Sequence, residues 1–431
     1  MASTNNFYLK FWRWVVLGAP AWWFLGVNLG IYHLAALLLL IGMMQSSLAG
    51  NLPVFLSSSS KFLLAYVVIY TFSLTANAPT AGDSMRVIAS AYNLSYWIMG
   101  LFLVTVMSNV FSLADTKVVF KTFFDMSLVI GLLTVVILIL MLAGFQTLMV
   151  YTPFYDLTKL LGHTTLVENS LVVKMLYWEW FASTLFPRFN LFSPYAVATA
   201  EVLVFILVMS ICHAQLQKKL RSPLFLFISL CVFFAMLMTL SRMPVIAFIA
   251  GGLVVFLIGK RQSFIWILLF SIFLFSIYPW IDQSINFILN LRQGSNLGRL
   301  ELYRYSLSRL EGIEWIIGRG IKNREELNFV GPLGSHSTYL SVLFRTGLVG
   351  LATFVSFQIY LFWTWYGLKS AAAKSPEHFF LWRALGWIFI AISMCMVTDE
   401  IDVPQLVAFL YFSLVGIFEG FRRSIEVSPG S

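Results

Sequence analysis

Charged residues are scarce in this chain. Only 11% of its 431 residues are Asp, Glu, Lys or Arg, whereas 59% are hydrophobic, and the mean hydropathy is +0.85. A soluble domain carries roughly a quarter of charged residues, because its surface must face water. The composition therefore excludes an ordinary soluble protein and indicates an integral membrane protein.

Cysteine is also rare. Cys212, Cys231 and Cys395 lie in or beside apolar runs and lack the spacing of metal ligands. This argues against a disulfide framework or a zinc site, and we expect no metal and no cofactor. A small-residue cleavage site is lacking after the first apolar run, so we expect that run to stay as a span. A formal charge of +9 could indicate binding to nucleic acid. In a membrane protein it is explained by the excess of basic residues in short cytoplasmic loops, so we expect no nucleic-acid partner.

Apolar runs of about 20 residues, long enough to cross a bilayer as helices, recur along the chain. We predict an all-α polytopic membrane protein with about twelve transmembrane helices in a single domain, 1–431. A hairpin at 223–259 turns at Ser241–Pro244, because one unbroken helix of that length would exceed the bilayer core. The predicted spans are 14–31, 33–49, 61–78, 88–111, 125–150, 192–212, 223–240, 243–259, 263–281, 337–366, 380–398 and 404–421.

Basic residues gather in alternate short links between these spans. The positive-inside rule assigns that side, and both termini with it, to the cytoplasm. The residues concerned are Lys10, Arg13, Lys61, Lys117, Lys121, Lys218, Lys219, Arg221, Lys260, Arg261, Lys369, Lys374, Arg422 and Arg423. The opposite side carries two long loops, 151–191 and 282–336, the second between spans 9 and 10, and loops of this length are often functional.

Arginines collect in the outer segments, where the positive-inside rule disfavours them. They are Arg188, Arg242, Arg292, Arg299, Arg304, Arg309, Arg319 and Arg324. A single interfacial arginine that extends to the membrane surface is common and needs no function. Several on one face favour an anion site, because the guanidinium forms bidentate bonds to phosphate oxygens and keeps its charge.

One outer segment, 298–312, has helical spacing of apolar residues. Leu300, Tyr303, Leu307 and Leu310 recur at intervals of three and four, which predicts that they form its buried face. An interfacial amphipathic helix with a solvated basic face is one interpretation. That interpretation suits Arg304 and Arg309 while Arg299 points inward.

His336 lies between a Gly/Pro-containing loop and a long apolar run, in "GPLGSHSTYL" (331–340). Ser335 or Ser337 is suited to cap the following helix. The positive end of a helix dipole disfavours a protonated imidazole, so a neutral His336 is suited to act as a general base. A capping or interfacial histidine is the plainer alternative, and spacing alone does not exclude it.

Five segments together resemble the O-antigen ligase and polymerase superfamily, bacterial membrane glycosyltransferases of the GT-C type. They are "PRFNLFSPYAVATA" (187–200), "SRMPVIAFIAGG" (241–252), "GRLELYRYSLSRLEGIEWIIGRGI" (298–321), "GSHSTYLSVLFRTGLVGL" (334–351) and "DEIDVPQLVAFLYF" (399–412). Each is weak alone, and their order and sidedness make the resemblance specific.

The resemblance implies an inverting, metal-independent glycosyl transfer at the outer face of a bacterial inner membrane. The donor would be a glycan on undecaprenyl diphosphate, bound through Arg188, Arg242 and Arg299. His336 would deprotonate the acceptor hydroxyl, with Arg304 and Asp402 as possible supporting residues. The implied partners are the donor, a lipid-linked or lipid A-core glycan acceptor, membrane lipids and, in some cases, a chain-length regulator.

The acceptor separates the alternatives within this class. Many relatives follow the histidine with asparagine, whereas Ser337 follows here, which favours a polymerase of surface polysaccharide (O-antigen, capsule or exopolysaccharide) over a ligase that transfers polymer to lipid A-core. A lipid-linked glycan transporter or flippase is the alternative from another class. Arg345 lies within a predicted span and must pair or face a cavity, and the sequence names no partner for it.

Overall fold

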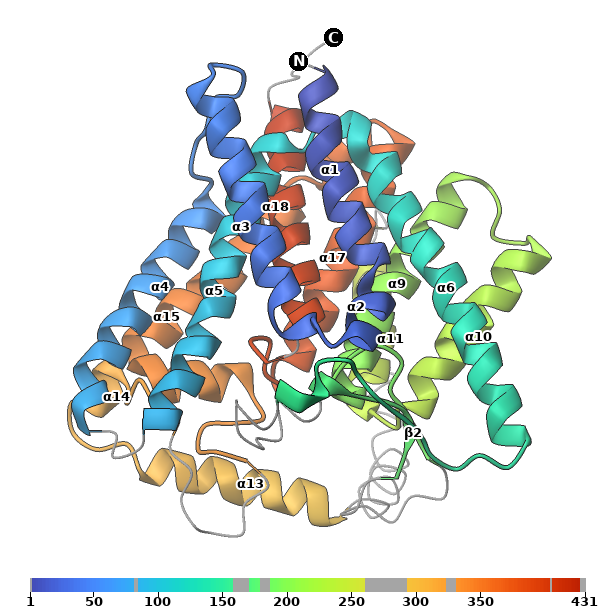
Figure 1. Ribbon diagram of the computed structural model, residues 1–431. Coiled ribbons are helices and arrows are strands. Elements are labelled where there is room, and N and C mark those ends of the chain that lie inside the picture. The colour runs from blue at the N-terminus through green and yellow to red at the C-terminus, as the bar shows by residue number, and fades with distance from the viewer. Residues whose placement is uncertain are drawn as a thin grey trace.

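Helices dominate the computed structural model (Figure 1), which describes residues 2–80, 84–157, 170–178, 187–259, 293–322, 331–403 and 405–426. Among these residues, nine helical segments are long and apolar enough to cross a membrane. Their helices are α3 (Asn28–Leu48), α4 (Ser58–Asn77), α5 (Ser84–Val110), α6 (Thr116–Leu142), α9 (Ala196–Leu216), α11 (Arg242–Gly259), α15 (Thr338–Gly367), α17 (Pro376–Cys395) and α18 (Gln405–Glu426). The predicted all-α polytopic architecture is confirmed at this level.

Most predicted spans overlap one of these helices. The predicted hairpin at 223–259 forms as α10 (Pro223–Met238) and α11, with the turn between them. Pro223 and Pro244 each lie in a first helical turn, where the missing N–H has no helical partner to lose. The predicted span 263–281 lies outside the described residues, so the count of twelve stays a prediction.

The first predicted span, 14–31, is wrong as a single helix. The structure places α1 at Ala2–Leu17 and a short α2 at Ala19–Leu25. Gly26 ends α2 in the left-handed conformation (φ 77°), with its N–H directed to Trp22 and Trp23 carbonyls, as in a glycine C-cap. The hydropathy of 14–31 is continuous across this break, which is why the run resembled one span.

The predicted span 125–150 is also corrected. Helix α6 begins earlier, at Thr116 behind a Ser112–Asp115 capping box, and ends at Leu142. An antiparallel sheet follows, formed by β1 (Leu148–Tyr151), β2 (Val172–Tyr177) and β3 (Arg188–Phe189) in that order. Short apolar runs such as 148–151 suit a strand as well as a helix end, so hydropathy alone could not distinguish them.

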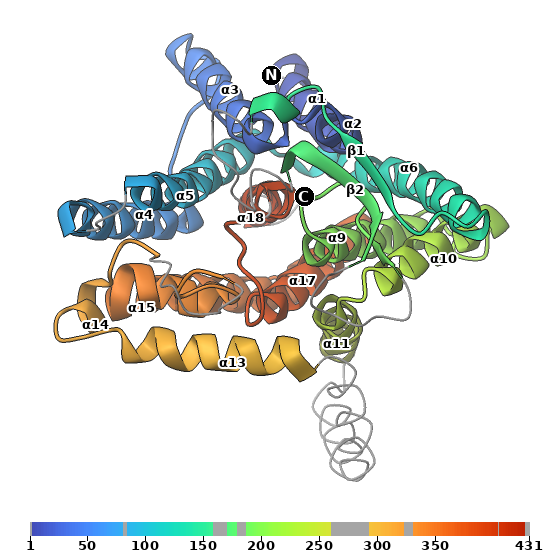
Figure 2. The same ribbon diagram turned by 60° about the horizontal axis from the view of Figure 1, so that its bottom comes forward.

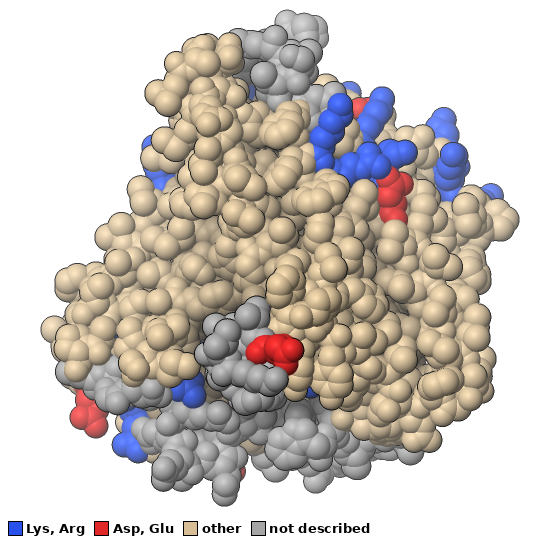
Figure 3. All heavy atoms as spheres, in the orientation of Figure 1, with Lys and Arg blue, Asp and Glu red and all other residues tan. Residues whose placement is uncertain are grey.

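The bundle has two different ends. The first turn of α1 and the last turn of α18 lie at one end, and α13 (Gln293–Ser308) and β2 lie at the other (Figure 1). On the face seen in Figure 3, the Lys and Arg side chains lie toward the two ends, and a broad band between them shows none. This is the distribution that a bilayer requires.

Basic residues predicted to share one side join helices at the end that holds the first turn of α1. Arg13 of α1 lies 2.5 Å from the Asp125 carboxylate of α6, and Lys117 of α6 lies 3.0 Å from that of Glu377 on α17. Helix α18 occupies the middle of the bundle when seen from the other end (Figure 2) and is almost fully buried. The link that precedes α18 therefore emerges at the centre of the α13 end.

Helix α15 is broken at Gly347 (φ 64°, ψ −166°). The carbonyls of Phe344 and Arg345 accept hydrogen bonds of 2.9 Å from the backbone N–H groups of Arg319 and Gly320. A Cβ on Gly347 would lie 2.2 Å from the Ile316 carbonyl oxygen, and one on Gly318 would lie 2.3 Å from the Arg345 carbonyl carbon. Glycines on both sides thus allow the segment after α14 (Glu314–Ile317) to contact the opened helix directly.

We expect Gly347→Ala to destabilise the protein by about 2–4 kcal/mol, because it combines a backbone clash with a left-handed φ. Thermal unfolding of the detergent-solubilised protein measures this. Gly367→Ala is the matched control, since Gly367 ends the same helix and a methyl group added there would meet no neighbouring side chain or segment within 4 Å. Equal unfolding temperatures for the two variants would contradict the proposed close packing.

Candidate functional site

The sequence-predicted residues meet where α15 and α18 begin and α17 ends. The first turn of α15 is tied to the link between α17 and α18, since the N–H of Thr338 donates to the carbonyls of Met396 and Asp399 at 2.8 and 3.0 Å. Helix α13 lies across this end beside α15 (Figure 2). Three segments far apart in the sequence therefore surround His336.

His336 has an unusual backbone. Its φ of 64° lies in the left-handed region, which a non-glycine residue adopts at a cost of about 1–3 kcal/mol when the surroundings enforce it. Its N–H donates to the Glu400 carboxylate at 3.0 Å, and its carbonyl accepts from the Tyr303 hydroxyl at 2.5 Å. Ser337, as predicted, caps α15, and its hydroxyl oxygen accepts from the Leu340 N–H at 3.4 Å.

The environment keeps the imidazole neutral. Burial, together with the cations of Arg299 and Lys322, lowers the pKa of His336 to about 4, against the opposing effect of Glu400. A pKa of this value leaves the ring deprotonated at neutral pH, as a proton acceptor must be. The predicted neutrality thus has a cause in burial and neighbouring cations, beyond the helix dipole.

Arg188 is brought to the turn between α10 and α11. It lies on β3 and is only 2% exposed. Its Nε donates to the Thr239 carbonyl at 2.6 Å, and its Nη2 donates to the Ser241 hydroxyl at 2.9 Å. Arg242 is the next residue along, half-buried at the start of α11. Two predicted diphosphate-binding arginines from separate segments are therefore neighbours.

Arg299 points inward, as predicted. Its Nη1 donates to the Thr398 carbonyl at 3.3 Å, and its Nη2 lies 3.9 Å from a carboxylate oxygen of Asp399. Burial raises the pKa of Asp399 to about 6, against the lowering effect of both Arg299 and Arg188. Both arginines therefore act on the Asp399 carboxyl group. The backbone of Asp399 is bonded to Thr338, two residues after His336.

The predicted buried face of 298–312 is wrong in part. Leu300 and Leu307 are 46% and 36% exposed, whereas Leu310, as predicted, and Leu302 are buried and pack with Leu333 and Phe344. Leu302 and Leu310 are eight residues apart, which is also a helical spacing, so spacing alone could not choose the face. Arg304 of α13 and Arg309, which follows α13, are exposed. Arg292 and Arg324 lie outside the described residues.

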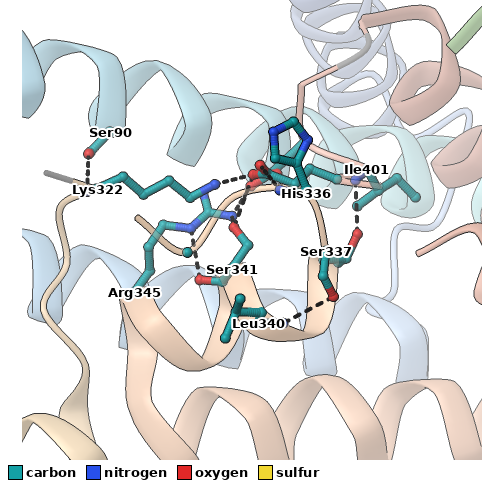
Figure 4. A network of polar contacts seen from close by, with 12 residues as sticks. Ser90, Lys322, His336, Ser337, Leu340, Ser341, Arg345 and Ile401 are labelled. Atoms are coloured by element: carbon teal, nitrogen blue, oxygen red, sulfur yellow. Dashed lines mark hydrogen bonds and ion pairs between the residues drawn. The ribbon is translucent and has the colours of Figure 1, made fainter. Parts of the chain in front are cut away.

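Glu400 and Lys322 form a buried ion pair that the sequence analysis did not single out (Figure 4). The two side chains are 8% and 6% exposed. Burial raises the pKa of Glu400, but Lys322 and Arg345 outweigh it and hold that pKa below its usual value. The sequence holds no local signal for this pair, because Lys322 and Glu400 are 78 residues apart.

Asp402 pairs with Arg345, the arginine for which the sequence named no partner. Both side chains are fully buried. Trp97 Nε1 donates to the Asp402 carboxylate at 2.9 Å, and Arg345 Nη1 donates to the Tyr70 hydroxyl at 3.1 Å. Asp402 thus forms its ion pair with Arg345 of α15, and its predicted supporting role stays a prediction. Its support of the site would be indirect, through the position of the helix that follows His336.

We expect Asp402→Ala to destabilise the protein by about 3–5 kcal/mol, because it leaves the Arg345 guanidinium buried without a counter-ion. The double variant Arg345→Met/Asp402→Ala removes both charges and should recover part of that loss. Thermal unfolding and the yield of monodisperse protein measure both. Equal unfolding temperatures for the single and double variants would contradict this contribution of the ion pair to stability.

Across the described ranges, no three His, Cys, Asp or Glu side chains gather in a way that could hold a metal ion. The arrangement offers instead a neutral histidine close to Arg299 of α13, while Arg188 of β3 acts on the neighbouring Asp399. Such a set can bind an anion and accept a proton close to it. The expectation of metal-independent chemistry stays a prediction.

Residues 224–355 match a family model described as O-antigen ligase. The matched segment is less than half of the chain and runs from α10 into α15, so it contains Arg242, Arg299 and His336 but neither Arg188 nor the 399–402 link. No curated protein matches the chain. Through this segment, the chain is similar to the O-antigen ligase family, in agreement with the resemblance seen in the sequence.

Proposed function

We propose that this protein is an inverting glycosyltransferase that polymerises repeat units of a surface polysaccharide. Its donor would be a glycan carried on undecaprenyl diphosphate, and its acceptor a hydroxyl of another lipid-linked repeat unit. The observation that carries the proposal is the neutral, mostly buried His336 close to Arg299. Arg299 in turn contacts Asp399, whose pKa is lowered by both Arg299 and Arg188. The family match supports this class of reaction in general.

The arginines would bind the diphosphate. Guanidinium groups form charge-assisted, bidentate bonds with phosphate oxygens, and they stabilise the charge that develops on a leaving diphosphate. Arg299 makes only a loose 3.9 Å contact with Asp399, which a phosphate oxygen at hydrogen-bond distance would exceed in strength. Arg188 and Arg242 would approach from the other side, through the turn at Ser241.

His336 would act as the general base. The imidazole accepts the proton of the acceptor hydroxyl while the hydroxyl oxygen attacks the anomeric carbon. The bond from that carbon to the diphosphate oxygen breaks, its electron pair leaves with undecaprenyl diphosphate, and the configuration inverts. The proton ends on the ring nitrogen, and negative charge at the diphosphate stabilises the resulting imidazolium.

The choice of a polymerase over a ligase rests on the sequence. Ser337, whose hydroxyl caps α15, stands where many relatives have asparagine, and this difference is what favours the polymerase. Transfer to lipid A-core is the alternative within the class, and flipping of a lipid-linked glycan is the alternative outside it. We place the protein in a bacterial inner membrane, with both termini cytoplasmic and the α13 end outside.

His336→Ala should abolish long polysaccharide chains in cells that lack the native protein, because general-base catalysis contributes a factor of about 100 to 10,000. Gel electrophoresis of the polysaccharide measures chain length. The matched control is His213→Ala, on α9 near the basic residues Lys121 and Lys219. Normal chains from His336→Ala would contradict the role of His336 as the general base.

A second experiment tests the flippase alternative. In vesicles with the lipid-linked donor only in the outer leaflet, the native protein should still transfer glycan, and no transfer there would favour a flippase.

Arg299→Ala should weaken binding of undecaprenyl diphosphate at least tenfold, as expected for loss of one charge-assisted phosphate contact worth about 1.5–3 kcal/mol. Arg188→Ala and Arg242→Ala should do the same. Binding to the purified protein in nanodiscs measures this. Arg309→Ala is the control, because Arg309 is an exposed residue just after α13 that lies against the Tyr305 ring. Equal affinities for Arg299→Ala and Arg309→Ala would contradict the proposed binding of the diphosphate by Arg299.

A further inference from the structure

The backbone of His336 is held from two sides by side chains of other segments. Tyr303 of α13 donates to its carbonyl, and Glu400 of the link before α18 accepts from its N–H. A non-glycine residue keeps a left-handed φ only where its surroundings over-determine it. The direction of the imidazole therefore depends on these two contacts.

Glu400 is the more constrained of the two partners. Its carboxylate accepts from three donors on three segments: the His336 N–H at 3.0 Å, the Ser341 hydroxyl at 3.1 Å, and the ammonium of Lys322. Both carboxylate oxygens are used, and the side chain is buried. Figure 4 shows Lys322, Ser341 and His336 converging on this point.

Lys322 fixes Glu400 in turn. Its chain segment cannot slide, because the Arg319 and Gly320 N–H groups bond to the opened carbonyls of α15, and the Lys322 N–H donates to the Ser90 hydroxyl at 3.4 Å. Ser341 also connects Glu400 to Arg345, whose guanidinium donates to the Ser341 hydroxyl. The carboxylate thus joins the outer segment after α14 to the histidine loop.

We propose that Glu400, held by Lys322 and Ser341, is a positioning residue that keeps the His336 backbone in the conformation that directs its imidazole to the arginine site. This role rests on the proposed function, since it has meaning only if His336 reacts. The charged groups that face His336 are Arg299 from α13, Lys322 from the segment after α14, and Glu400 itself.

The first test compares two changes at Glu400. Glu400→Ala removes the acceptor for the His336 N–H and should lower kcat at least tenfold, with KM for the lipid-linked donor unchanged. Lys322→Met/Glu400→Gln removes both buried charges but keeps an amide oxygen for that N–H, so kcat should stay within a few-fold of the native value. The substrate is the lipid-linked repeat unit extracted from source cells that lack this chain.

Glu419→Ala is the matched control. Glu419 is also a buried glutamate, and it accepts from the Ser59 N–H at 3.1 Å, from the Tyr360 hydroxyl at 3.0 Å, and from Arg422, at the other end of α18. Its loss should lower stability without lowering kcat of the folded fraction. A fall in kcat equal to that of Glu400→Ala would reduce the effect at Glu400 to general destabilisation and overturn the proposal.

The pH profile separates positioning from mere structural support. Glu400 raises the pKa of His336 and Lys322 lowers it. The acid limb of kcat/KM, where the base becomes protonated, should therefore move to higher pH in Lys322→Met and to lower pH in Glu400→Gln. A structural pair far from the base would move neither limb, so fixed limbs in both variants would overturn the proposal even if Glu400→Ala fails to fold.

His336→Ala in the same assay distinguishes a failure of the proposed function from a failure of the positioning role of Glu400. If His336→Ala is active, the proposed function fails. If His336→Ala is inactive while Glu400→Ala retains the native kcat, the proposed function stands and the positioning role of Glu400 is wrong.

Discussion

The α13 end of the bundle depends on one constraint: a buried charge needs a partner. The short link before α18 supplies three carboxyl groups within four residues, and each faces a different cation. Asp399 faces Arg299 and lies in the field of Arg188, Glu400 pairs with Lys322, and Asp402 pairs with Arg345. Because an unpaired charge in this environment would be costly, these pairs fix three separate segments relative to the link.

Close backbone packing makes this arrangement possible. The segment that carries Lys322 reaches Glu400 only because it contacts α15 at the break of Gly347, with Gly318 and Gly320 against backbone atoms of α15 and α4. A side chain at any of these positions would displace the segment. The helix break lets the segment with Lys322 contact α15, and the buried ion pairs hold it there. His336, with its left-handed φ, lies next to these pairs.

Hydropathy predicted most of the long helices among the described residues, because a bilayer imposes span length directly, whereas the sidedness stays a prediction. Hydropathy failed where a continuous apolar run hides a local break, at Gly18 to Gly26, and where an apolar run becomes a strand, at 148–151. Part of the candidate site could be identified from the sequence, and the roles of its residues stay predictions. Arg188, Arg242, Arg299 and His336 were identified from motifs, whereas the pairing of Lys322 with Glu400 requires three-dimensional proximity that no local spacing encodes.

The electrostatics of the site also bear on the order of events in the proposed reaction. In this structure His336 is neutral but a weak base, because Arg299 and Lys322 add to the effect of burial. A diphosphate bound at Arg299 would offset that cation and place negative charge near the imidazole, and both effects favour its protonated form. The base would therefore gain strength only when the donor is present. Deprotonation of the acceptor would then be coupled to donor binding by charge alone, without any conformational change.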